Sequence, residues 1–129
     1  MKSQTNWVLV SILAAILIIG GVIWYAIWYQ SQPGQYDSFA ECLASKGMTF
    51  YGAFWCPHCQ AQKAMFGKSV DKLPYVECST PDGNGQTQIC IDKNIQGYPT
   101  WATKNGSTTE GVLTFTQLSQ LSGCTAPQQ

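Results

Sequence analysis

An uninterrupted apolar segment near the N-terminus constrains this chain more than any other feature. Residues 7–29 read WVLVSILAAILIIGGVIWYAIWY and carry no charged side chain. About 20 such residues span a bilayer core as a helix, and the aromatic residues at both ends suit the membrane interfaces. A cleaved signal peptide is the alternative, but its apolar region is shorter and ends at small residues. We predict an uncleaved transmembrane anchor, with a tail of residues 1–6 before it and a polar linker of residues 30–37 after it.

The few charges near this segment predict its orientation. Lys2 and the terminal amine precede it, and the next cationic side chain after it is Lys46. Positive charge accumulates on the cytoplasmic side of membrane proteins. We therefore expect residues 1–6 in the cytoplasm and residues 30–129 on the other side, in the periplasm, at the cell exterior or in a thylakoid lumen. The six cysteines of the chain favour the same side, because disulfides persist in oxidising compartments.

The charge composition argues against several classes of protein. Lys and Arg total 7, all of them lysine, and Asp and Glu total 7, so the net charge is zero. A nucleic-acid-binding domain needs a basic patch, which this composition does not favour. The single histidine, His58, is too few for a histidine-rich metal site. We expect no nucleic-acid partner, no bound metal and no bound cofactor.

Two pairs of residues have the spacing of a helix capping box, in which a Ser or Thr and a residue three positions later satisfy backbone amides. Ser38 and Glu41 predict a short helix over residues 39–46. Thr114 and Gln117 predict the last helix of the chain.

The segments between these helices predict a mixed sheet. Asn105 and Gly106 form a pair typical of two-residue hairpin turns, so the strands on either side are expected to be antiparallel. A strand–helix–strand unit earlier in the chain adds a parallel pair. The expected fold is α/β, a mixed four-stranded sheet flanked by helices, preceded by one transmembrane helix. The expected strands are residues 48–55, 73–78, 98–103 and 107–113, and the further expected helices are residues 57–66 and 86–94.

The residues that carry chemistry are Cys56-Pro57-His58-Cys59. Two cysteines at this spacing either bind a metal or alternate between dithiol and disulfide. Zinc usually needs a second pair at similar spacing, and the other four cysteines are isolated in the sequence. A purely structural Cys56–Cys59 bridge is a further alternative, but so short a loop contributes little stability. The motif therefore predicts redox chemistry.

The position of the motif supports that prediction. It follows a predicted buried strand and opens a helix, and Pro57 fits the first helical turn because its missing N–H has no helical partner there. The helix amides and dipole stabilise a thiolate at Cys56. A protonated His58 adds positive charge beside it. A more stable thiolate favours the reduced form and makes the disulfide a stronger oxidant.

Several motifs together resemble the thioredoxin superfamily. They are YGAFWCPHC at residues 51–59 and GYPT at residues 97–100, followed by the predicted hairpin and last helix. More narrowly, FAECL, MTFYGAFWCPHCQAQK, YVEC, GYPTW and SGC resemble the thioredoxin-like domain associated with bacterial and plant vitamin K epoxide reductase homologues. The resemblance covers residues 38–124 and leaves residues 125–129 as a tail. It implies a thioredoxin-like fold and electron transfer from folding proteins to a quinone-reducing membrane bundle.

This resemblance implies roles for individual residues. Cys56 corresponds to the attacking, more exposed sulfur and Cys59 to the resolving one. Pro99 corresponds to the family's cis-proline, which faces the CxxC motif and orients a substrate strand. Trp55 and Tyr98, which flank these groups in the sequence, are expected to contact the substrate together with Pro99.

One position departs from the thioredoxin pattern. Thioredoxins carry a buried aspartate six residues before the first cysteine of the motif, and this chain has Phe50 there. We expect Glu77 or water to accept the proton of Cys59 instead. The missing acid, together with His58, favours an oxidase or isomerase over a reductase.

The four remaining cysteines are predicted to be structural. Cys78 ends a predicted strand and Cys90 lies in the next helix, and a bridge closing so short a loop contributes about 3 kcal/mol by chain entropy. By elimination, Cys42 pairs with Cys124 and ties the first helix of the domain to the chain end. A second redox pair formed by Cys78 and Cys90 is the functional alternative.

The sequence as a whole predicts a membrane-anchored, extracytoplasmic thiol–disulfide oxidoreductase that oxidises protein thiols. Its expected reoxidising partner is a separate, quinone-linked membrane oxidoreductase of the vitamin K epoxide reductase type, because this chain has one predicted span. The main alternative is a thiol reductase, for cytochrome maturation or general disulfide reduction. A copper chaperone is a weaker alternative, because it would use two cysteines and a distal histidine, and the one histidine of this chain lies within the motif. A non-catalytic binding module is also weaker, since it would not need a CxxC motif at a helix start.

Overall fold

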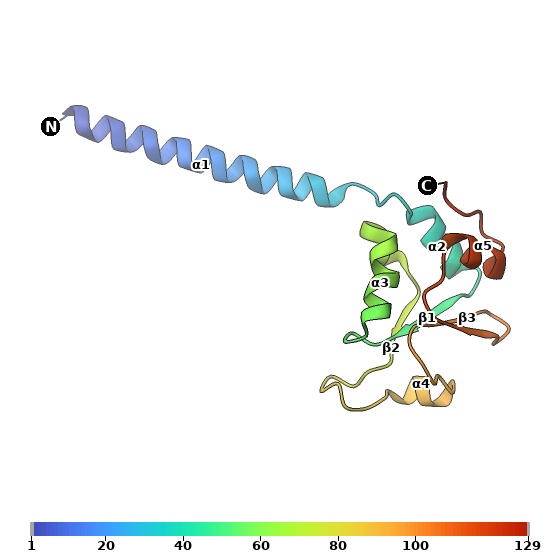
Figure 1. Ribbon diagram of the computed structural model, residues 1–129. Helices are drawn as coiled ribbons and strands as arrows, with labels where there is room; N and C mark the ends of the chain where they lie inside the picture. The colour runs from blue at the N-terminus through green and yellow to red at the C-terminus, as the bar shows by residue number, and fades with distance from the viewer. Residues whose placement is uncertain (1, 129) are drawn as a thin grey trace. The chain divides into compact units, whose positions relative to one another are not determined.

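The computed structural model describes residues 2–128 and consists of two units, which we describe separately (Figure 1). The first unit ends at Gln32 and contains the helix α1, Lys2–Ser31. From Asn6 to Ser31 this helix is long and apolar enough to cross a membrane, and none of that stretch is buried in protein. No other helix within the described part of the chain meets these criteria. The predicted span therefore lies within a helix that continues beyond it at both ends.

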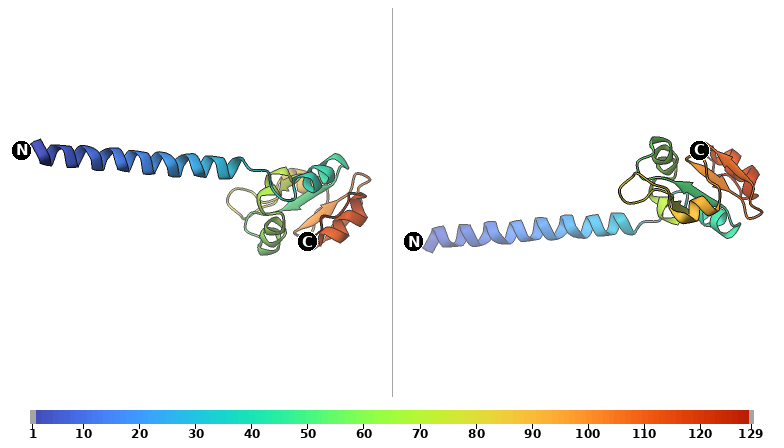
Figure 2. Two further views of the ribbon diagram at one scale, coloured as in Figure 1. Left: turned by 90° about the horizontal axis from the view of Figure 1, so that it is seen from above. Right: turned by 90° about the horizontal axis from the view of Figure 1, so that it is seen from below.

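The second unit begins at Pro33 and is built on a four-stranded sheet with the strand order β2-β1-β3-β4 (Figures 1 and 2). β1 is parallel to β2 and antiparallel to β3, and β3 is antiparallel to β4. The predicted mixed sheet is confirmed, although each strand is shorter than predicted. The strands are β1 (Thr49–Gly52), β2 (Tyr75–Glu77), β3 (Thr100–Ala102) and β4 (Thr108–Glu110), and the helices are α2 (Asp37–Ser45), α3 (Pro57–Phe66), the 3-10 helix η1 (Gly67–Lys72), α4 (Gln88–Asp92) and α5 (Phe115–Ser122).

Successive residues of a strand point to opposite faces of the sheet. Apolar side chains therefore lie on both faces of this sheet, and helices cover both. Phe50 of β1 belongs to the larger core, which it shares with residues of α2, α3 and α5, and it stacks on Trp101 of β3 with ring centroids 4.8 Å apart. The next residue, Tyr51, belongs to a smaller core with Cys78 and Cys90. Figure 1 shows α3 and α4 on opposite sides of the strands.

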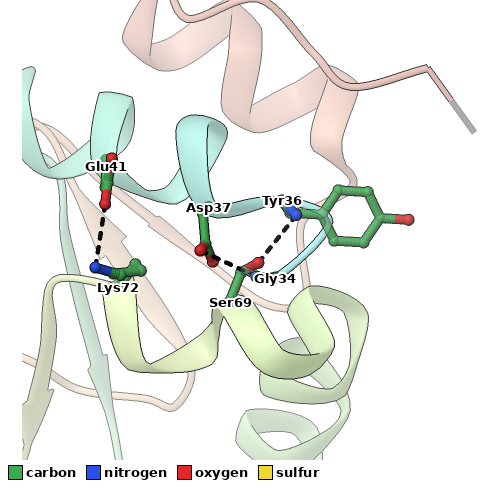
Figure 3. A network of polar contacts seen from close by, with 6 residues as sticks. All are labelled: Gly34, Tyr36, Asp37, Glu41, Ser69 and Lys72. Atoms are coloured by element: carbon green, nitrogen blue, oxygen red, sulfur yellow. Dashed lines mark hydrogen bonds and ion pairs between the residues drawn. The ribbon is translucent and has the colours of Figure 1, made fainter. Parts of the chain in front are cut away.

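Helix α2 begins at Asp37, so the capping box predicted for Ser38 and Glu41 is wrong. The N-cap residue is Tyr36, and no side chain caps this helix. Glu41 instead forms an ion pair with Lys72 of η1 at 3.2 Å (Figure 3). A carboxylate that reaches across to another element is not available to bond an amide at the start of its own helix.

The predicted linker over residues 30–37 is also shorter in the structure, because its second half is held by hydrogen bonds. The Gly34 N–H donates to Asp37 Oδ2 at 3.0 Å, and the Tyr36 N–H donates to Ser69 Oγ at 2.9 Å (Figure 3). A side chain on Gly34 would clash with Ser69. The folded domain therefore starts several residues earlier than its first predicted helix.

The β3–β4 hairpin has a three-residue turn, so the predicted two-residue turn is wrong. The Thr103 N–H donates to the Ser107 carbonyl oxygen at 2.9 Å, and the Gly106 N–H donates to the Thr103 carbonyl oxygen at 2.9 Å. Gly106 has φ of 88°, but Asn105 has no positive φ. A two-residue type I′ turn needs positive φ at both central residues, whereas a three-residue turn needs it at the last one.

The capping box predicted for α5 is confirmed. Thr114 Oγ1 accepts the Gln117 N–H at 3.2 Å, and Gln117 Oε1 accepts the Thr114 N–H at 2.8 Å. The helix ends at Gly123, whose φ of 76° is in the left-handed region that glycine adopts without steric cost. Residues of α5 complete the larger core.

Candidate active site

The two cysteines of the CxxC motif lie at the start of α3. Cys56 is the N-cap residue and Pro57 occupies the first turn, as the sequence predicted. Cys56 Sγ accepts a hydrogen bond from the Cys59 N–H at 3.3 Å. The sulfur thus takes the place of the side-chain oxygen that usually satisfies an amide at a helix start. An anionic sulfur is favoured there, because the helix dipole is positive at this end.

The loop before β3 lies against the first cysteine of the motif. The Cys56 thiol donates to the Tyr98 carbonyl oxygen at 3.7 Å. The Tyr98–Pro99 peptide bond is cis, and Pro99 is buried. The structure therefore brings Cys56 next to Tyr98 and Pro99, which follow it by more than forty positions along the chain.

The two sulfur-bearing residues differ in their surroundings. Cys56 is 4 % exposed and Cys59 is fully buried, so any partner reaches Cys56 first. Pro57 and His58, between them, are exposed on the outer side of the helix start. Both cysteines are free thiols.

Two exposed aromatic side chains stand beside Cys56. Trp55 is 52 % exposed and Phe54 is 49 % exposed, although both precede a buried helix start. The Trp55 Nε1–H donates to Ser79 Oγ at 2.8 Å, and its ring lies edge-on to that of Tyr98, with centroids 6.1 Å apart. These contacts fix the Trp55 ring at the mouth of the site. Phe54 was not among the predicted site residues, because an aromatic residue at a strand end is usually read as core.

A polar cavity of about 340 Å³ adjoins Trp55 and Tyr98. Its far wall is the loop after β2, which is closed by a bridge between Ser79 and Gln86. Gln86 Nε2 donates to the Tyr98 hydroxyl at 2.7 Å. The cavity therefore adjoins Trp55, the residue directly before Cys56. Its further lining residues are Gly83, Asn84, Gly85, Ile95 and Gln96.

The other four cysteines form two disulfides, and the pairs are those expected from the sequence. Cys78 is bonded to Cys90 with an S–S distance of 1.98 Å, which ties the end of β2 to α4 beside the polar cavity. Cys42 is bonded to Cys124 with an S–S distance of 2.05 Å, which ties α2 to the segment after α5. Both bridges lie outside the CxxC motif.

Burial raises the pKa of Cys59 to about 12, and the hydrogen bond with Cys56 adds to this effect. The side chain packs against Gly52 of β1, where a Cβ would lie 3.0 Å from Cys59 Sγ and 2.9 Å from Tyr75 Cε2. A residue larger than glycine does not fit at this position. Gly52 was not among the predicted site residues, since its closeness to the thiol depends on how α3 packs on the sheet.

The position of the missing thioredoxin aspartate is fully apolar. Phe50 is completely buried and contacts the ring of Tyr75 edge-on, with centroids 5.2 Å apart. Glu77, one of the expected proton acceptors for Cys59, is engaged elsewhere. Glu77 Oε2 accepts the Tyr75 hydroxyl at 2.6 Å, and Glu77 Oε1 accepts the N–H groups of Phe54 and Ser79 at 3.2 and 2.8 Å.

Tyr75 joins this carboxylate to the region of the buried thiol. Burial and the neighbouring Glu77 raise the pKa of Tyr75 well above its usual value, so the phenol keeps its proton. In the described part of the chain, no three side chains of His, Cys, Asp or Glu gather closely enough to hold a metal ion. The arrangement presents the two thiols of the motif, one nearer the surface and one enclosed.

Comparison with known proteins agrees with this geometry. The sequence matches the family described as Thioredoxin over residues 34–122. The chain belongs to the thioredoxin family. It is also 42 % identical over 96 residues to the thiol-disulfide oxidoreductase LTO1 of Arabidopsis thaliana.

The extent of that second match is asymmetric. It covers 70 % of this chain but 25 % of LTO1, so the chain spans about a quarter of the length of this relative. The predicted thioredoxin superfamily membership and fold are confirmed for the chain. The narrower association with vitamin K epoxide reductase homologues stays a prediction.

Proposed function

We propose that this protein is a membrane-anchored thiol–disulfide oxidoreductase that uses Cys56 and Cys59 on protein thiols. One observation carries the proposal. The Cys56 sulfur sits at the N-terminus of α3, accepts the Cys59 N–H, and faces the carbonyl before cis-Pro99. The name of the relative LTO1 describes the same activity for that protein.

The proposed reaction follows from the difference in exposure between the two cysteines. In the oxidised protein, a substrate thiolate attacks Cys56 Sγ and forms a mixed disulfide. The Cys56–Cys59 bond breaks, and its electron pair leaves on Cys59. A second substrate thiolate then attacks the substrate sulfur of the mixed disulfide. The substrate leaves as a disulfide, and the two electrons it has lost remain on the Cys56–Cys59 dithiol.

We propose that Trp55, Tyr98 and Pro99 hold the substrate segment during this exchange. Trp55 and Tyr98 border the polar cavity beside Cys56, and Pro99 follows the carbonyl that the Cys56 thiol contacts. A substrate peptide whose amides pair with the backbone of the half-buried Tyr98 would place its sulfur next to Cys56. The Cys78–Cys90 disulfide supports the loop on the far side of the same cavity.

The proposed direction is oxidation of the substrate. The positive end of the α3 dipole lies at Cys56, and a protonated His58 would add positive charge beside it. Both would stabilise the reduced form, and a more stable reduced form makes the disulfide the stronger oxidant. We further propose that residues 30–129 face away from the cytoplasm and that a quinone-linked membrane oxidoreductase of the vitamin K epoxide reductase type accepts the electrons. The apolar helix from Asn6 to Ser31 supports the membrane attachment.

Equilibrium titration of the full chain against glutathione tests the direction of electron flow. Trapping of free thiols with a maleimide reagent at each redox ratio reports the fraction of reduced Cys56–Cys59. We expect a potential above the approximately −270 mV of thioredoxin and nearer the approximately −180 mV of protein disulfide isomerase. His58→Gln is expected to make the potential more negative, by about 30 mV for each 1.4 kcal/mol of lost thiolate stabilisation. A wild-type potential at or below that of thioredoxin would support the reductase alternative.

A further inference from the structure

The side chain of Lys63 places a positive charge near the buried cysteine of the motif. Lys63 follows Cys59 by four residues on α3, and residues four apart share one face of a helix. Lys63 Nζ lies 3.5 Å from the centroid of the Tyr75 ring, close enough for a cation–π interaction. The edge of the same ring lies close to the thiol, because a Cβ built on Gly52 would lie 2.9 Å from Tyr75 Cε2 and 3.0 Å from Cys59 Sγ. The Tyr75 ring therefore contacts the ammonium group with its face and lies near the thiol with its edge.

The Tyr75 ring is itself held in position. Its hydroxyl donates to Glu77 Oε2 at 2.6 Å, and the other carboxylate oxygen of Glu77 accepts the backbone N–H groups of Phe54 and Ser79. The two bonds to Glu77 Oε1 fix the carboxylate to the backbone of Phe54 and Ser79. The carboxylate therefore fixes the ring, and the ring provides a fixed face for Lys63.

We propose that Lys63 is a positioning residue that stabilises the thiolate of Cys59 during disulfide exchange, and that Tyr75 and Glu77 hold its ammonium group in place. The inference rests on the proposed function. It makes Lys63 the charged side chain near Cys59 in a protein that has Phe50 where thioredoxins carry a buried aspartate. The charge has an identifiable electrostatic effect: burial raises the pKa of Cys59 to about 12, and the positive charge of Lys63 opposes that rise.

The ionisable groups around Cys59 come from two elements. α3 contributes Cys56 and Lys63, and β2 contributes Tyr75 and Glu77. Of these groups, Lys63 is the one that carries a positive charge.

The proposed role applies in both directions of the exchange. When a substrate thiolate attacks Cys56 Sγ, the Cys56–Cys59 bond breaks and Cys59 leaves with the electron pair as a thiolate. In the reverse step, the Cys59 thiolate attacks Cys56 Sγ of the mixed disulfide, forms the Cys56–Cys59 bond and releases the substrate thiolate. Both steps pass through negative charge on Cys59, and a nearby cation lowers the free energy of that charge.

Reaction of the reduced full chain with Ellman's reagent separates the two cysteines. Cys56 attacks the aromatic disulfide and releases one coloured thiolate, and Cys59 then attacks Cys56 and releases a second. We expect Lys63→Gln to slow the second release relative to the first, by about threefold for each unit by which the pKa of Cys59 rises. A higher pKa makes the thiolate more nucleophilic, but the smaller fraction of thiolate outweighs this gain. The pH profile of the second release is expected to shift to higher pH.

Matched variants separate the charge of Lys63 from a structural effect. Lys63→Arg keeps the charge and is expected to retain the wild-type pH profile. Tyr75→Leu, which removes the ring under the Lys63 ammonium group, is expected to shift the profile in the same direction as Lys63→Gln. Lys104→Gln is the control for the loss of a positive charge elsewhere. Lys104 is exposed in the turn between β3 and β4, and the variant is expected to keep the wild-type pH profile.

The outcomes distinguish this inference from the proposed function. A second release from Lys63→Gln that matches the wild type at every pH would overturn the role of Lys63, as would an equal slowing by Lys104→Gln. A wild-type protein that gives no second release would overturn the proposed exchange between Cys56 and Cys59, and the inference with it.

Discussion

The side-chain amide of Gln62 is hydrogen-bonded twice to the backbone of Leu113. Gln62 Oε1 accepts the Leu113 N–H at 2.7 Å, and Gln62 Nε2 donates to the Leu113 carbonyl oxygen at 3.1 Å. The same oxygen also accepts the Trp101 Nε1–H at 3.2 Å. Gln62 is completely buried, one helical turn after Cys59. A polar side chain therefore joins α3, β3 and the segment before α5 inside the larger core, and it fixes the helix that carries the redox motif.

Replacing Gln62 tests the strength of this connection. Gln62→Ala leaves three buried polar groups without their partner, and an unsatisfied buried group costs about 1–3 kcal/mol. We expect the free energy of unfolding to fall by about 3 kcal/mol, measured by urea unfolding of the full chain in detergent. Gln120→Ala, the same substitution at an exposed position of α5, is the control, and an equal loss in both variants would contradict the role of Gln62.

The two structural disulfides are expected to differ in their contribution to stability. Cys42 and Cys124 are separated by 82 positions, and Cys78 and Cys90 by 12. Chain entropy assigns about 4.5 kcal/mol to the longer loop and about 3 kcal/mol to the shorter one. Urea unfolding of the two double alanine variants should therefore show the larger loss for Cys42→Ala with Cys124→Ala. The opposite order would mean that loop closure is not the main effect of these bridges.

The division of roles between the redox cysteines predicts how substrates are trapped. Cys59→Ser removes the enclosed thiol and leaves Cys56, which is nearer the surface. We expect this variant to accumulate mixed disulfides with protein substrates, visible on non-reducing gels and absent after reduction. Cys56→Ser should trap far less, because Cys59 is fully buried. Equal trapping by both variants would contradict the assignment of Cys56 as the attacking sulfur.

The raised pKa of Cys59 predicts a specific dependence of stability on pH. Burial raises the pKa of Cys59 in the folded protein to about 12, whereas the pKa of a cysteine exposed in the unfolded chain is 9.0. Above pH 9 the unfolded chain releases this proton first, so stability is lost as the pH rises from 9 towards 12. We expect Cys56→Ser, whose Cys59 stays a free thiol, to lose more stability over this range than Cys56→Ser combined with Cys59→Ala. Urea unfolding at successive pH values measures both, and parallel profiles would show that burial does not hold the proton on Cys59.

The proposed orientation in the membrane predicts which reagents reach Cys56. After mild reduction of intact cells, a membrane-impermeant thiol reagent should modify Cys56 before lysis. Cys56→Ser is the control for labelling elsewhere. If Cys56 became reactive only after lysis, the domain would lie on the cytoplasmic side and the orientation inferred from Lys2 and Lys46 would be wrong.

Local signals explain most of what could be predicted about the fold. The four-stranded mixed sheet and the start of α5 at Thr114 are both read from neighbouring residues, because side-chain alternation and helix capping act over a few positions. Predictions of the same kind failed where a more distant partner was involved. Glu41 is drawn to Lys72, and Ser69 holds the backbone of Tyr36, so α2 and the segment before it begin elsewhere than the local pattern indicated.

The sequence by itself determined the apolar N-terminal helix and the CxxC motif at the start of a helix, since composition and spacing alone specify both. Only the tertiary structure placed Lys63, Tyr75 and Glu77 around Cys59. Cys59 and Lys63 lie on α3, whereas Tyr75 and Glu77 lie on β2. Nothing in their spacing along the chain predicts that the two pairs meet, because they meet only when the helix packs on the sheet. The packing of α3 over Gly52 decides that these side chains meet, and it depends on contacts made by the whole domain, including the buried amide of Gln62.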